Sequence, residues 1–180
     1  MSKPITIHIL AADTGLQAHV VRAAAEHYGA TVSVTWAGNS SQVVDYLSSR
    51  PVHDLIILSF HGDDRGMLLP PLAEECRSLY PYFDVICPAD FAQFLALDGN
   101  IVLSHACSGG IPAMAEAFLS GGAAAYVGAE GDPNTAASTK YVLDFLYGYL
   151  IEFSQDVEKS HLAAKSGADD RGMFRLFTSA

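Results

Sequence analysis

Short apolar runs alternate along the chain with stretches in which apolar residues recur at helical spacing. Six runs have the length and the β-branched content of strands, and they lie at residues 5–10, 31–36, 55–60, 101–104, 123–127 and 173–177. Residues 55–60 are apolar except for Ser59, which is typical of a central strand buried on both faces. The alternation predicts an α/β fold, a three-layer αβα sandwich with a mostly parallel sheet of about six strands.

Helices are predicted between these runs. They cover residues 16–28, 41–49, 89–96, 136–153 and 157–165, and a further helix opens at Gly109-Gly110 and ends near residue 119. Residues 61–70 are predicted to form a loop that leads into a short strand or hairpin arm. Residues 70–88 hold four prolines and are predicted to be irregular, with a short helix at 72–79. No linker is evident, so we expect residues 1–180 to form a single domain.

The composition limits the expected partners. Ten Lys and Arg residues stand against twenty Asp and Glu residues, which gives a formal net charge of −10. Such a chain lacks the basic stripe that binds nucleic acid or an anionic membrane, so we expect neither as a partner. The first apolar run is too short for a signal peptide, and no apolar stretch approaches the roughly 20 residues that span a bilayer.

The chain has three cysteines, Cys76, Cys87 and Cys107. Their number is odd and their spacing matches no metal motif such as C-x-x-C, so we expect free thiols. Free thiols are typical of a reducing compartment. The sequence therefore predicts a cytoplasmic protein, and nothing in it determines an oligomeric state.

Reactive residues follow two of the predicted strands. His61 and Gly62 come directly after residues 55–60, and Cys107 comes shortly after residues 101–104. Ligands of open α/β sheets bind at the carboxyl ends of parallel strands, so neighbouring strands would place His61 and Cys107 in one crevice. A cysteine nucleophile needs a base nearby, because the thiolate is the attacking species. A helix beginning just after Cys107 would lower the pKa of its thiol further.

Each of these residues also has an inert interpretation. A single cysteine after an apolar strand is more often a core residue, and a single histidine at a strand end is more often a hydrogen-bonded structural group. Here both types stand at strand ends, and glycines follow each of them, which lets backbone approach a substrate closely. The combination favours a catalytic pair.

Two sequence blocks carry a resemblance to a known family. Residues 55–62 (LIILSFHG) are an apolar strand ending in His-Gly, and residues 101–110 (IVLSHACSGG) are an apolar strand ending in Ala-Cys. This order resembles the caspase, legumain, gingipain and metacaspase group, the clan CD cysteine peptidases. Cys107-Ser108-Gly109 is similar to the Cys-x-Ser-Gly surroundings of legumain-type and metacaspase members, shortened by one residue. Residues 121–128 (GGAAAYVG) and 172–177 (GMFRLF) resemble strands of the bacterial CHAT branch.

The resemblance implies a cysteine endopeptidase with a Cys-His dyad, which acts on a peptide or protein substrate without a metal or cofactor. Cys107 would attack the scissile carbonyl, and His61 would protonate the leaving amine. The backbone N–H groups of Gly62 and Cys107 would form the oxyanion hole. Enzymes of this group select a charged or amide side chain at P1, the substrate residue that precedes the scissile bond.

The same resemblance predicts substrate-binding residues. The loop at 128–134 would line the P1 pocket, where Glu130 or Asp132 would favour Lys or Arg at P1, and Asp63 would add charge to the cleft. The alternative is that Asp132-Pro133-Asn134 is a helix N-cap with turn residues and that Asp63 is a solvated loop residue. His105 stands where relatives often have an acidic residue or Gln. It would tune the thiolate, line the P1 pocket or point into the core.

Other functions stay open. The chain is short for a complete caspase-like enzyme, so a catalytically inactive or partner-activated binding or scaffold module is the main alternative. An acyl-transfer hydrolase other than a peptidase would use the same Cys-His chemistry. A receiver domain is disfavoured because Ser59-Phe60-His61 stands where its phosphorylated Asp would be. A flavodoxin-like FMN site is disfavoured because residues 11–15 suit a phosphate loop only in part.

Overall fold

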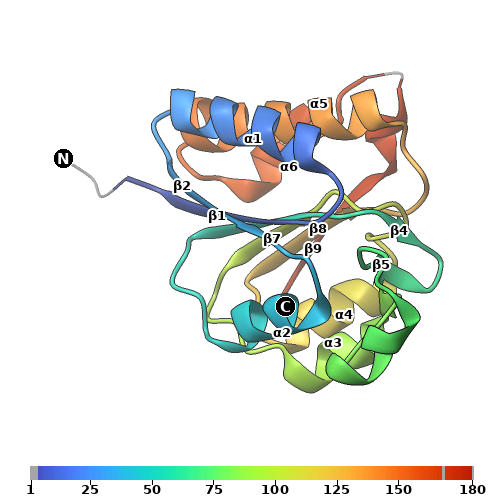
Figure 1. The fold of residues 1–180 in the computed structure, drawn as a ribbon. Helices are drawn as coiled ribbons and strands as arrows, with labels where there is room; N and C mark the ends of the chain where they lie inside the picture. Colours follow the sequence, from blue (N-terminus) through green and yellow to red (C-terminus); the bar gives the residue numbers. More distant parts are fainter. Residues whose placement is uncertain (1–3, 168, 180) are drawn as a thin grey trace.

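A computed structural model describes residues 4–167 and 169–179 of the chain. Its main sheet has six strands in the order β2-β1-β3-β7-β8-β9 (Figure 1). The strands are β1 (Thr6–Ala11), β2 (Thr31–Trp36), β3 (Leu55–Ser59), β7 (Ile101–Ser104), β8 (Ala125–Ala129) and β9 (Phe174–Thr178). All neighbouring pairs are parallel except β8 and β9, which are antiparallel. The predicted six-stranded, mostly parallel sheet is confirmed.

Helices cover both faces of this sheet and complete the predicted three-layer sandwich (Figure 1). One layer holds α1 (Gly15–His27), α5 (Thr135–Tyr147) and α6 (Val157–Lys165), and the other holds α2 (Ser40–Ser48), α3 (Pro88–Phe94) and α4 (Pro112–Ser120). The shorter helical turns are η1 (Glu74–Leu79), η2 (Gly148–Glu152) and η3 (Asp170–Met173). Within residues 4–167 and 169–179, no helix is both long enough and apolar enough to cross a membrane.

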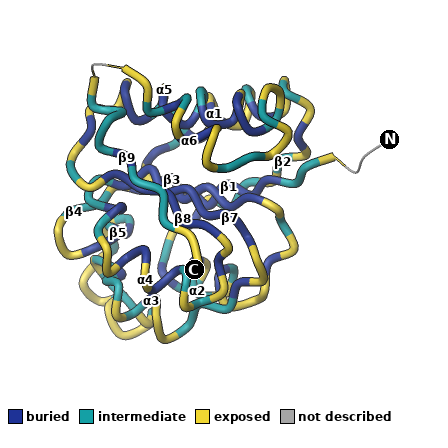
Figure 2. Tube along the Cα trace, turned by 180° about the vertical axis from the view of Figure 1, so that it is seen from behind, coloured by how far each residue is buried: buried dark blue, intermediate teal, exposed yellow. Residues whose placement is uncertain are grey.

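Strand β3 forms the centre of the hydrophobic core. Leu55 and Ile57 pack in the layer with α1, α5 and α6, whereas Ile56 and Leu58 pack in the layer with α2, α3 and α4. All five residues of the strand are buried, and Figure 2 shows the middle of the sheet as a buried slab. Alternate side chains of a strand point to opposite faces, so a fully apolar strand contributes to both layers. The predicted burial of this strand on both faces is confirmed.

A second, smaller sheet follows β3 along the chain. It has three antiparallel strands, β4 (Gly62–Asp63), β5 (Gly66–Leu68) and β6 (Val85–Ile86). The hairpin arm predicted after residue 61 corresponds to β4 and β5. Strand β6 is absent from the predicted elements, because two residues in a proline-rich stretch leave no strand pattern. Pairing with β5 is what defines it.

The boundaries of α4, β8 and α5 are among those that differ from the prediction. Helix α4 begins at Pro112 rather than at Gly109-Gly110, because Gly110 donates its amide hydrogen to β8 at 2.7 Å and so lies in a turn. Strand β8 begins at residue 125 rather than 123. The predicted helix at 136–153 changes at Gly148 into the π-helical turn η2. A side chain at Gly148 would meet the ring of Phe153 at 3.1 Å, which explains the glycine there.

Two histidines are buried in the layers beside the sheet. His8 stacks on Tyr46 with ring centroids 4.0 Å apart, and its Nδ1 lies 2.7 Å from Ser33 Oγ. His161 Nδ1 lies 2.6 Å from the hydroxyl oxygen of Tyr141. Burial lowers the pKa of both imidazoles to about 4. Both rings are therefore neutral in the folded protein near neutral pH.

These histidines should make the fold sensitive to acid. As the pH falls from 6.5 to 4, the unfolded chain takes up protons that the folded chain does not, so the free energy of unfolding decreases. Each of these largely buried histidines contributes on the order of 1–2 kcal/mol to the loss over that window, since solvent screens part of the effect. Urea unfolding across this pH range measures it, and His8→Phe should flatten the dependence. His19→Gln changes an exposed residue of α1 and should not, so equal slopes for the two variants would contradict the assignment.

Candidate active site

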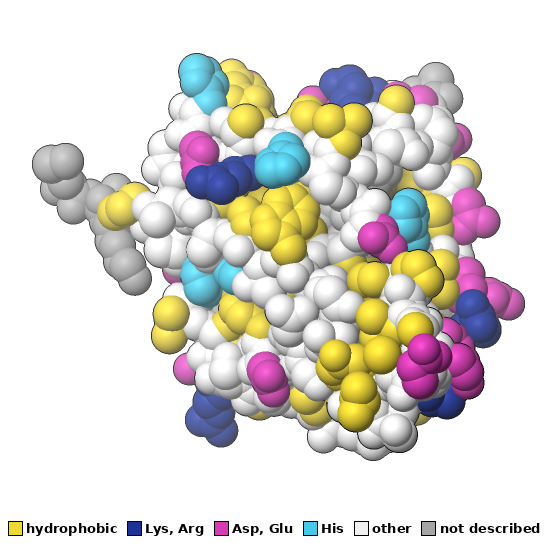
Figure 3. Space-filling view, in the orientation of Figure 1, with side chains coloured by type: hydrophobic (Ala, Val, Ile, Leu, Met, Phe, Trp, Pro, Cys, Tyr) yellow, Lys and Arg dark blue, Asp and Glu magenta, His cyan; other side chains and the backbone are white. Residues whose placement is uncertain are grey.

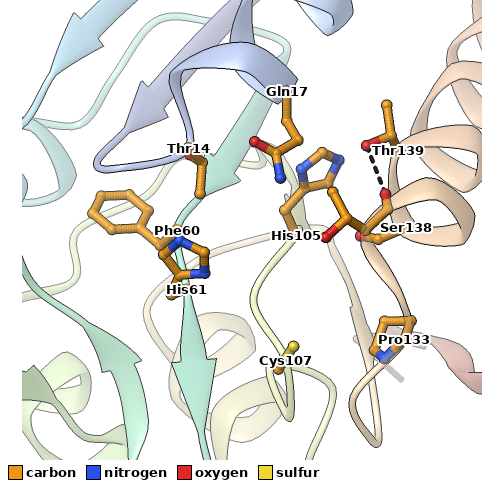
Figure 4. Close-up of a pocket in the computed structure, with 10 residues that line it drawn as sticks. Thr14, Gln17, Phe60, His61, His105, Cys107, Pro133, Ser138 and Thr139 are labelled. Atoms are coloured by element: carbon orange, nitrogen blue, oxygen red, sulfur yellow. Dashed lines mark hydrogen bonds between the residues drawn. The ribbon is translucent and has the colours of Figure 1, made fainter.

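The crevice predicted from the sequence is present at the carboxyl edge of the main sheet. Strands β3 and β7 are parallel neighbours, with Leu58 paired to Ser104, so the residues that follow them emerge at the same edge. His61 and Cys107 both line one cavity of about 50 Å³ (Figure 4). The first turns of two helices supply further walls, namely Thr14 and Gln17 at the start of α1 and Thr135, Ser138 and Thr139 at the start of α5.

The backbone of Gly62 lies directly against the backbone of Cys107. A Cβ atom at Gly62 would collide with the carbonyl oxygen of Cys107, and it would lie 2.9 Å from the Cβ atom of Ala106 and 3.3 Å from the amide nitrogen of Cys107. Only glycine leaves room for such an approach. The contact accounts for the glycine after His61, because it holds the histidine loop against the cysteine loop.

The segment after Cys107 is a tight turn held by β8 and the loop that follows it. Ser108 has a φ of 53°, in the left-handed region, and its amide donates to the carbonyl oxygen of Gly131 at 2.9 Å. The hydroxyl of Tyr126 donates to the carbonyl oxygen of Gly109 at 2.6 Å. A serine in this conformation is uncommon and persists only where its surroundings fix it. The cysteine is therefore held in a constrained loop rather than at the start of a helix.

The surroundings of the Cys107 thiol favour its protonated form. Burial, followed by the carboxylate of Asp132, raises the pKa of the Cys107 thiol above its ordinary value, and the backbone amide of Cys107 opposes this shift. The expectation that a helix lowers this pKa is wrong. Helix α4 begins only at Pro112, and the influence of a helix end is confined to about one turn.

His61 is exposed at the cavity and comes from the loop between the two sheets. Its carbonyl oxygen accepts a hydrogen bond from the Leu68 amide at 3.0 Å, which ties the loop to β5. In the described part of the chain, no hydrogen bond joins the His61 ring to the Cys107 sulfur (Figure 4). Catalytic hydrogen bonds are often long without substrate and tighten when it binds, so the two groups remain a candidate pair.

His105 lines the inner part of the same cavity. It is 8% exposed, and burial lowers the pKa of its ring to about 4, so the ring is neutral. Among the described residues its Nε2 has no hydrogen-bond partner. Figure 4 places the ring near Gln17 and Ser138, on the side of the cavity formed by α1 and α5. Of the three roles considered for His105, this position supports the lining of a pocket.

The three acidic residues predicted to bind substrate do not line the cavity. Glu130 forms an ion pair with Arg175 at 2.8 Å, and Asp63 forms one with Arg65 at 2.7 Å. Asp132 accepts a long hydrogen bond from Ser108 Oγ at 3.4 Å and acts on the Cys107 thiol through its charge. Within the described ranges, no three His, Cys, Asp or Glu side chains are grouped to hold a metal ion.

The helix N-cap considered for residues 132–134 is present, and Asn134 supplies it. The Asn134 side chain accepts a hydrogen bond from the Ala137 amide at 3.0 Å at the start of α5. The sequence analysis did not single out Thr14, Gln17 or Ser138. A signal for them exists, because the first turns after β1 and β8 reach the same sheet edge as His61 and Cys107.

Solved structures share this fold. No family model matches the chain, and no curated protein matches its sequence. Gingipain R, described as an Arg-specific cysteine proteinase, superposes with a TM-score of 0.64 at 12% identity over 97% of this chain and 46% of its own. A complex of the pro- and mature domains of Porphyromonas gingivalis RgpB gives 0.63 at 12% identity, over 97% and 47%. A secreted C11 cysteine protease from Bacteroides thetaiotaomicron, bound to an irreversible peptide inhibitor, gives 0.55 at 13% identity, over 98% and 66%.

These neighbours establish the fold. The chain has the caspase-like α/β architecture found in clan CD cysteine peptidases, as the sequence predicts. It spans less than half the length of the gingipain R chain. At such low identity the similarity establishes the architecture alone, so the roles of the site residues depend on the geometry of the site itself.

Removing the charge of Asp132 should activate the thiol. Because this carboxylate raises the pKa of Cys107, Asp132→Asn should lower that pKa and speed alkylation at neutral pH several-fold. The rate of iodoacetamide labelling between pH 6 and 9, followed by intact mass in a Cys76→Ser/Cys87→Ser background, measures the effect. Asp98→Asn, at the opposite end of β7, serves as the matched control. An unchanged or slower rate for Asp132→Asn would show that its charge does not reach the sulfur.

The close approach at Gly62 can be tested separately. Gly62→Ala should lower the free energy of unfolding by about 1–3 kcal/mol, because the added methyl meets backbone that has little room to move. Gly172→Ala is the control, since a Cβ atom there meets nothing within 4 Å. Chemical unfolding compares the two. Similar stabilities would mean that the two loops are not held together as described.

Proposed function

We propose that the chain is a cysteine endopeptidase in which Cys107 is the nucleophile and His61 transfers protons. The observation that carries the proposal is the cavity that both side chains line at the carboxyl ends of β3 and β7. The close contact of Gly62 with Cys107 supports it, because it holds the histidine loop against the cysteine loop. The side chains of His61 and Cys107 both line the cavity that lies beside this contact.

The proposed reaction begins with Cys107 in its thiol form. With substrate bound, His61 accepts the thiol proton of Cys107 as the sulfur attacks the scissile carbonyl, and the backbone N–H groups of Gly62 and Cys107 stabilise the resulting oxyanion. The C–N bond then breaks, and His61 donates its proton to the leaving amine. Water hydrolyses the thioester with His61 as the base, which releases the carboxylic acid and restores the thiol.

A basic P1 residue is the specificity expected from the sequence, and it now depends on a single carboxylate. Glu130 and Asp63 are both engaged by arginines, so Asp132 is the residue that would attract a cation near Cys107. The structure of gingipain R is described as that of an Arg-specific proteinase, which is a property of that enzyme. For this chain, Lys or Arg at P1 stays a prediction.

A partner-activated or catalytically inactive binding module is the second candidate. Two observations favour it. The pKa of the Cys107 thiol is raised rather than lowered, and no hydrogen bond joins the His61 ring to the Cys107 sulfur in the described part of the chain. On this alternative the same cavity would hold a peptide without cleaving it, or would need a further protein to bring His61 and Cys107 together.

The setting proposed for the chain follows from its charge and its thiols. In the structure all three cysteines are free, which supports a reducing cytoplasm. On the face drawn in Figure 3 the Lys and Arg side chains are scattered, which supports a peptide partner rather than nucleic acid or an anionic membrane. We also infer a single domain over residues 1–180. The finer resemblance to the CHAT branch remains a prediction.

The proposed chemistry gives a direct test on a mixed peptide library read by mass spectrometry. Cys107→Ala should abolish cleavage, and His61→Ala should lower kcat/KM by about 10²–10⁴-fold, the usual contribution of a general acid–base group. His27→Ala changes an exposed residue on α1 and should cleave like the wild type. Cleavage that survives Cys107→Ala would overturn the assignment of the nucleophile. A wild-type chain that binds peptides without cleaving them would support the binding module.

A further inference from the structure

A second cluster of reactive side chains lies at the β2 edge of the main sheet. It consists of His8 on β1, Ser33 on the edge strand β2, Tyr46 on α2 and His53 in the loop before β3 (Figure 1). His8 and Ser33 are partners in the parallel register, so their side chains emerge on the same face of the sheet. None of the described residues that line the cavity beside Cys107 belongs to this cluster. It is therefore a separate candidate site.

Two imidazole rings meet at the hydroxyl of Ser33. His8 Nδ1 lies 2.7 Å from Ser33 Oγ, and His53 Nε2 lies 3.0 Å from the same oxygen. On the other side of its ring, His53 Nδ1 lies 3.1 Å from the hydroxyl oxygen of Tyr46. A serine hydroxyl has one hydrogen to donate and lone pairs that accept. Ser33 can therefore donate to one imidazole while it accepts an N–H from the other.

The burial of His8 fixes the direction of these hydrogen bonds. His8 is only 5% exposed, and its Nε2 has no hydrogen-bond partner among the described residues. Buried N–H groups without a partner are rarer in proteins than acceptors without one, so the hydrogen of the neutral His8 ring belongs on Nδ1. Ser33 Oγ accepts that hydrogen and donates its own to His53 Nε2. The hydrogen of His53 is then on Nδ1, which donates to Tyr46.

His53 has the properties of a base for this serine. Burial lowers the pKa of the His53 ring, and the carboxylate of Asp54 opposes this shift. The ring is therefore neutral near neutral pH, and its Nε2 can accept a proton from Ser33. The same carboxylate would stabilise the imidazolium that forms. Tyr46 orients the ring through the hydrogen bond to Nδ1, which is the part that a third group plays beside a nucleophile and its base.

The hydroxyl of Ser33 is also within reach of a reagent. Ser33 is an exposed residue, and β2 is an edge strand of the main sheet. The ring of His8 beneath it is fixed by stacking on Tyr46, with ring centroids 4.0 Å apart. A serine hydroxyl is a weak nucleophile until an adjacent base activates it. Here an exposed hydroxyl and a base lie together on a fixed support.

We propose that Ser33 is a second nucleophile of this protein, which accepts an acyl group from an activated ester with His53 as its base. The proposal is independent of the peptidase function. Ser33 Oγ forms a bond to the ester carbonyl carbon, and its proton passes to His53 Nε2. The bond from that carbon to the leaving oxygen then breaks, and the leaving group departs as an anion. His53 releases the proton to solvent, and the product is an O-acylserine.

Acetylation by p-nitrophenyl acetate tests the proposal. The reaction is run at neutral pH on the folded Cys107→Ala protein, so that the peptidase nucleophile is absent, and tandem mass spectrometry of its peptides locates and counts the acetyl groups. Ser33 should be acetylated at least about 10²-fold faster than Ser48, the lower end of what a general base contributes. Ser48 is an exposed residue of α2 without a hydrogen bond to a histidine in the described part of the chain. Equal rates at the two serines would overturn the proposal.

A histidine variant tests the base. His53→Gln keeps a polar side chain that cannot take up the proton, so it should slow acetylation of Ser33 by about 10²-fold or more. His19→Gln, which changes an exposed histidine of α1, is the matched control and should leave the rate unchanged. Urea unfolding of both variants confirms that they are folded. An unchanged rate in folded His53→Gln would overturn the role of His53.

NMR of the ring nitrogens tests the direction of the hydrogen bonds without any reagent. In the wild type, ¹⁵N shifts should show the hydrogen on Nδ1 in both His8 and His53. Tyr46→Phe keeps an aromatic ring for stacking but removes the acceptor, so it should shift the His53 ring toward the other tautomer and slow acetylation of Ser33 about tenfold. A wild-type His53 ring with its hydrogen on Nε2 could not accept from Ser33 and would overturn the assignment of the base.

Discussion

The parallel pairing of β3 with β7 is the constraint on which the site depends. This pairing brings the loops after β3 and β7 to one edge of the sheet. The register, in which Leu58 pairs with Ser104, sets the positions of His61 and Cys107 relative to that edge. Gly62 then lets those loops touch through their backbones. The helices that begin after β1 and β8 complete the enclosure from one layer of the sandwich. A one-residue slip between β3 and β7 would turn every side chain of the shorter strand to the wrong face and separate the pair.

Most of the fold follows from local pattern. The strand at 55–60 is apolar nearly throughout and could only be central, and the helix at 157–165 has clear boundaries that the structure reproduces as α6. What the pattern misses is structure that exists only through tertiary contact. Gly109-Gly110 looks like the start of a helix, yet the Ser108 amide bonds to the loop after β8 and the Gly110 amide bonds to β8, so the helix is delayed to Pro112. Strand β6 is defined by its partner β5 alone.

Some features of the candidate site likewise follow from the sequence pattern, and others depend on tertiary contacts. His61 and Cys107 could be found because each follows a recognisable strand, and a topological rule brings strand ends together. The ionisation of Cys107 could not be found, because it depends on burial and on Asp132, which lies 25 positions further along the chain. Glu130 and Asp63 look equally available in the sequence, but Arg175 and Arg65 occupy them. The same rule brings the helices that hold Gln17 and Ser138 to this edge, but only packing shows that these two side chains share one pocket with His105.

The raised pKa of the Cys107 thiol has a consequence for the durability of the protein. Peroxide converts cysteine to sulfenic and then to sulfinic acid at a rate that follows the fraction present as thiolate and its access to solvent. A sulfur held protonated and half-buried by its loop is therefore a poor target for oxidants. The same burial that slows its chemistry in the resting state would also slow its oxidation by peroxide.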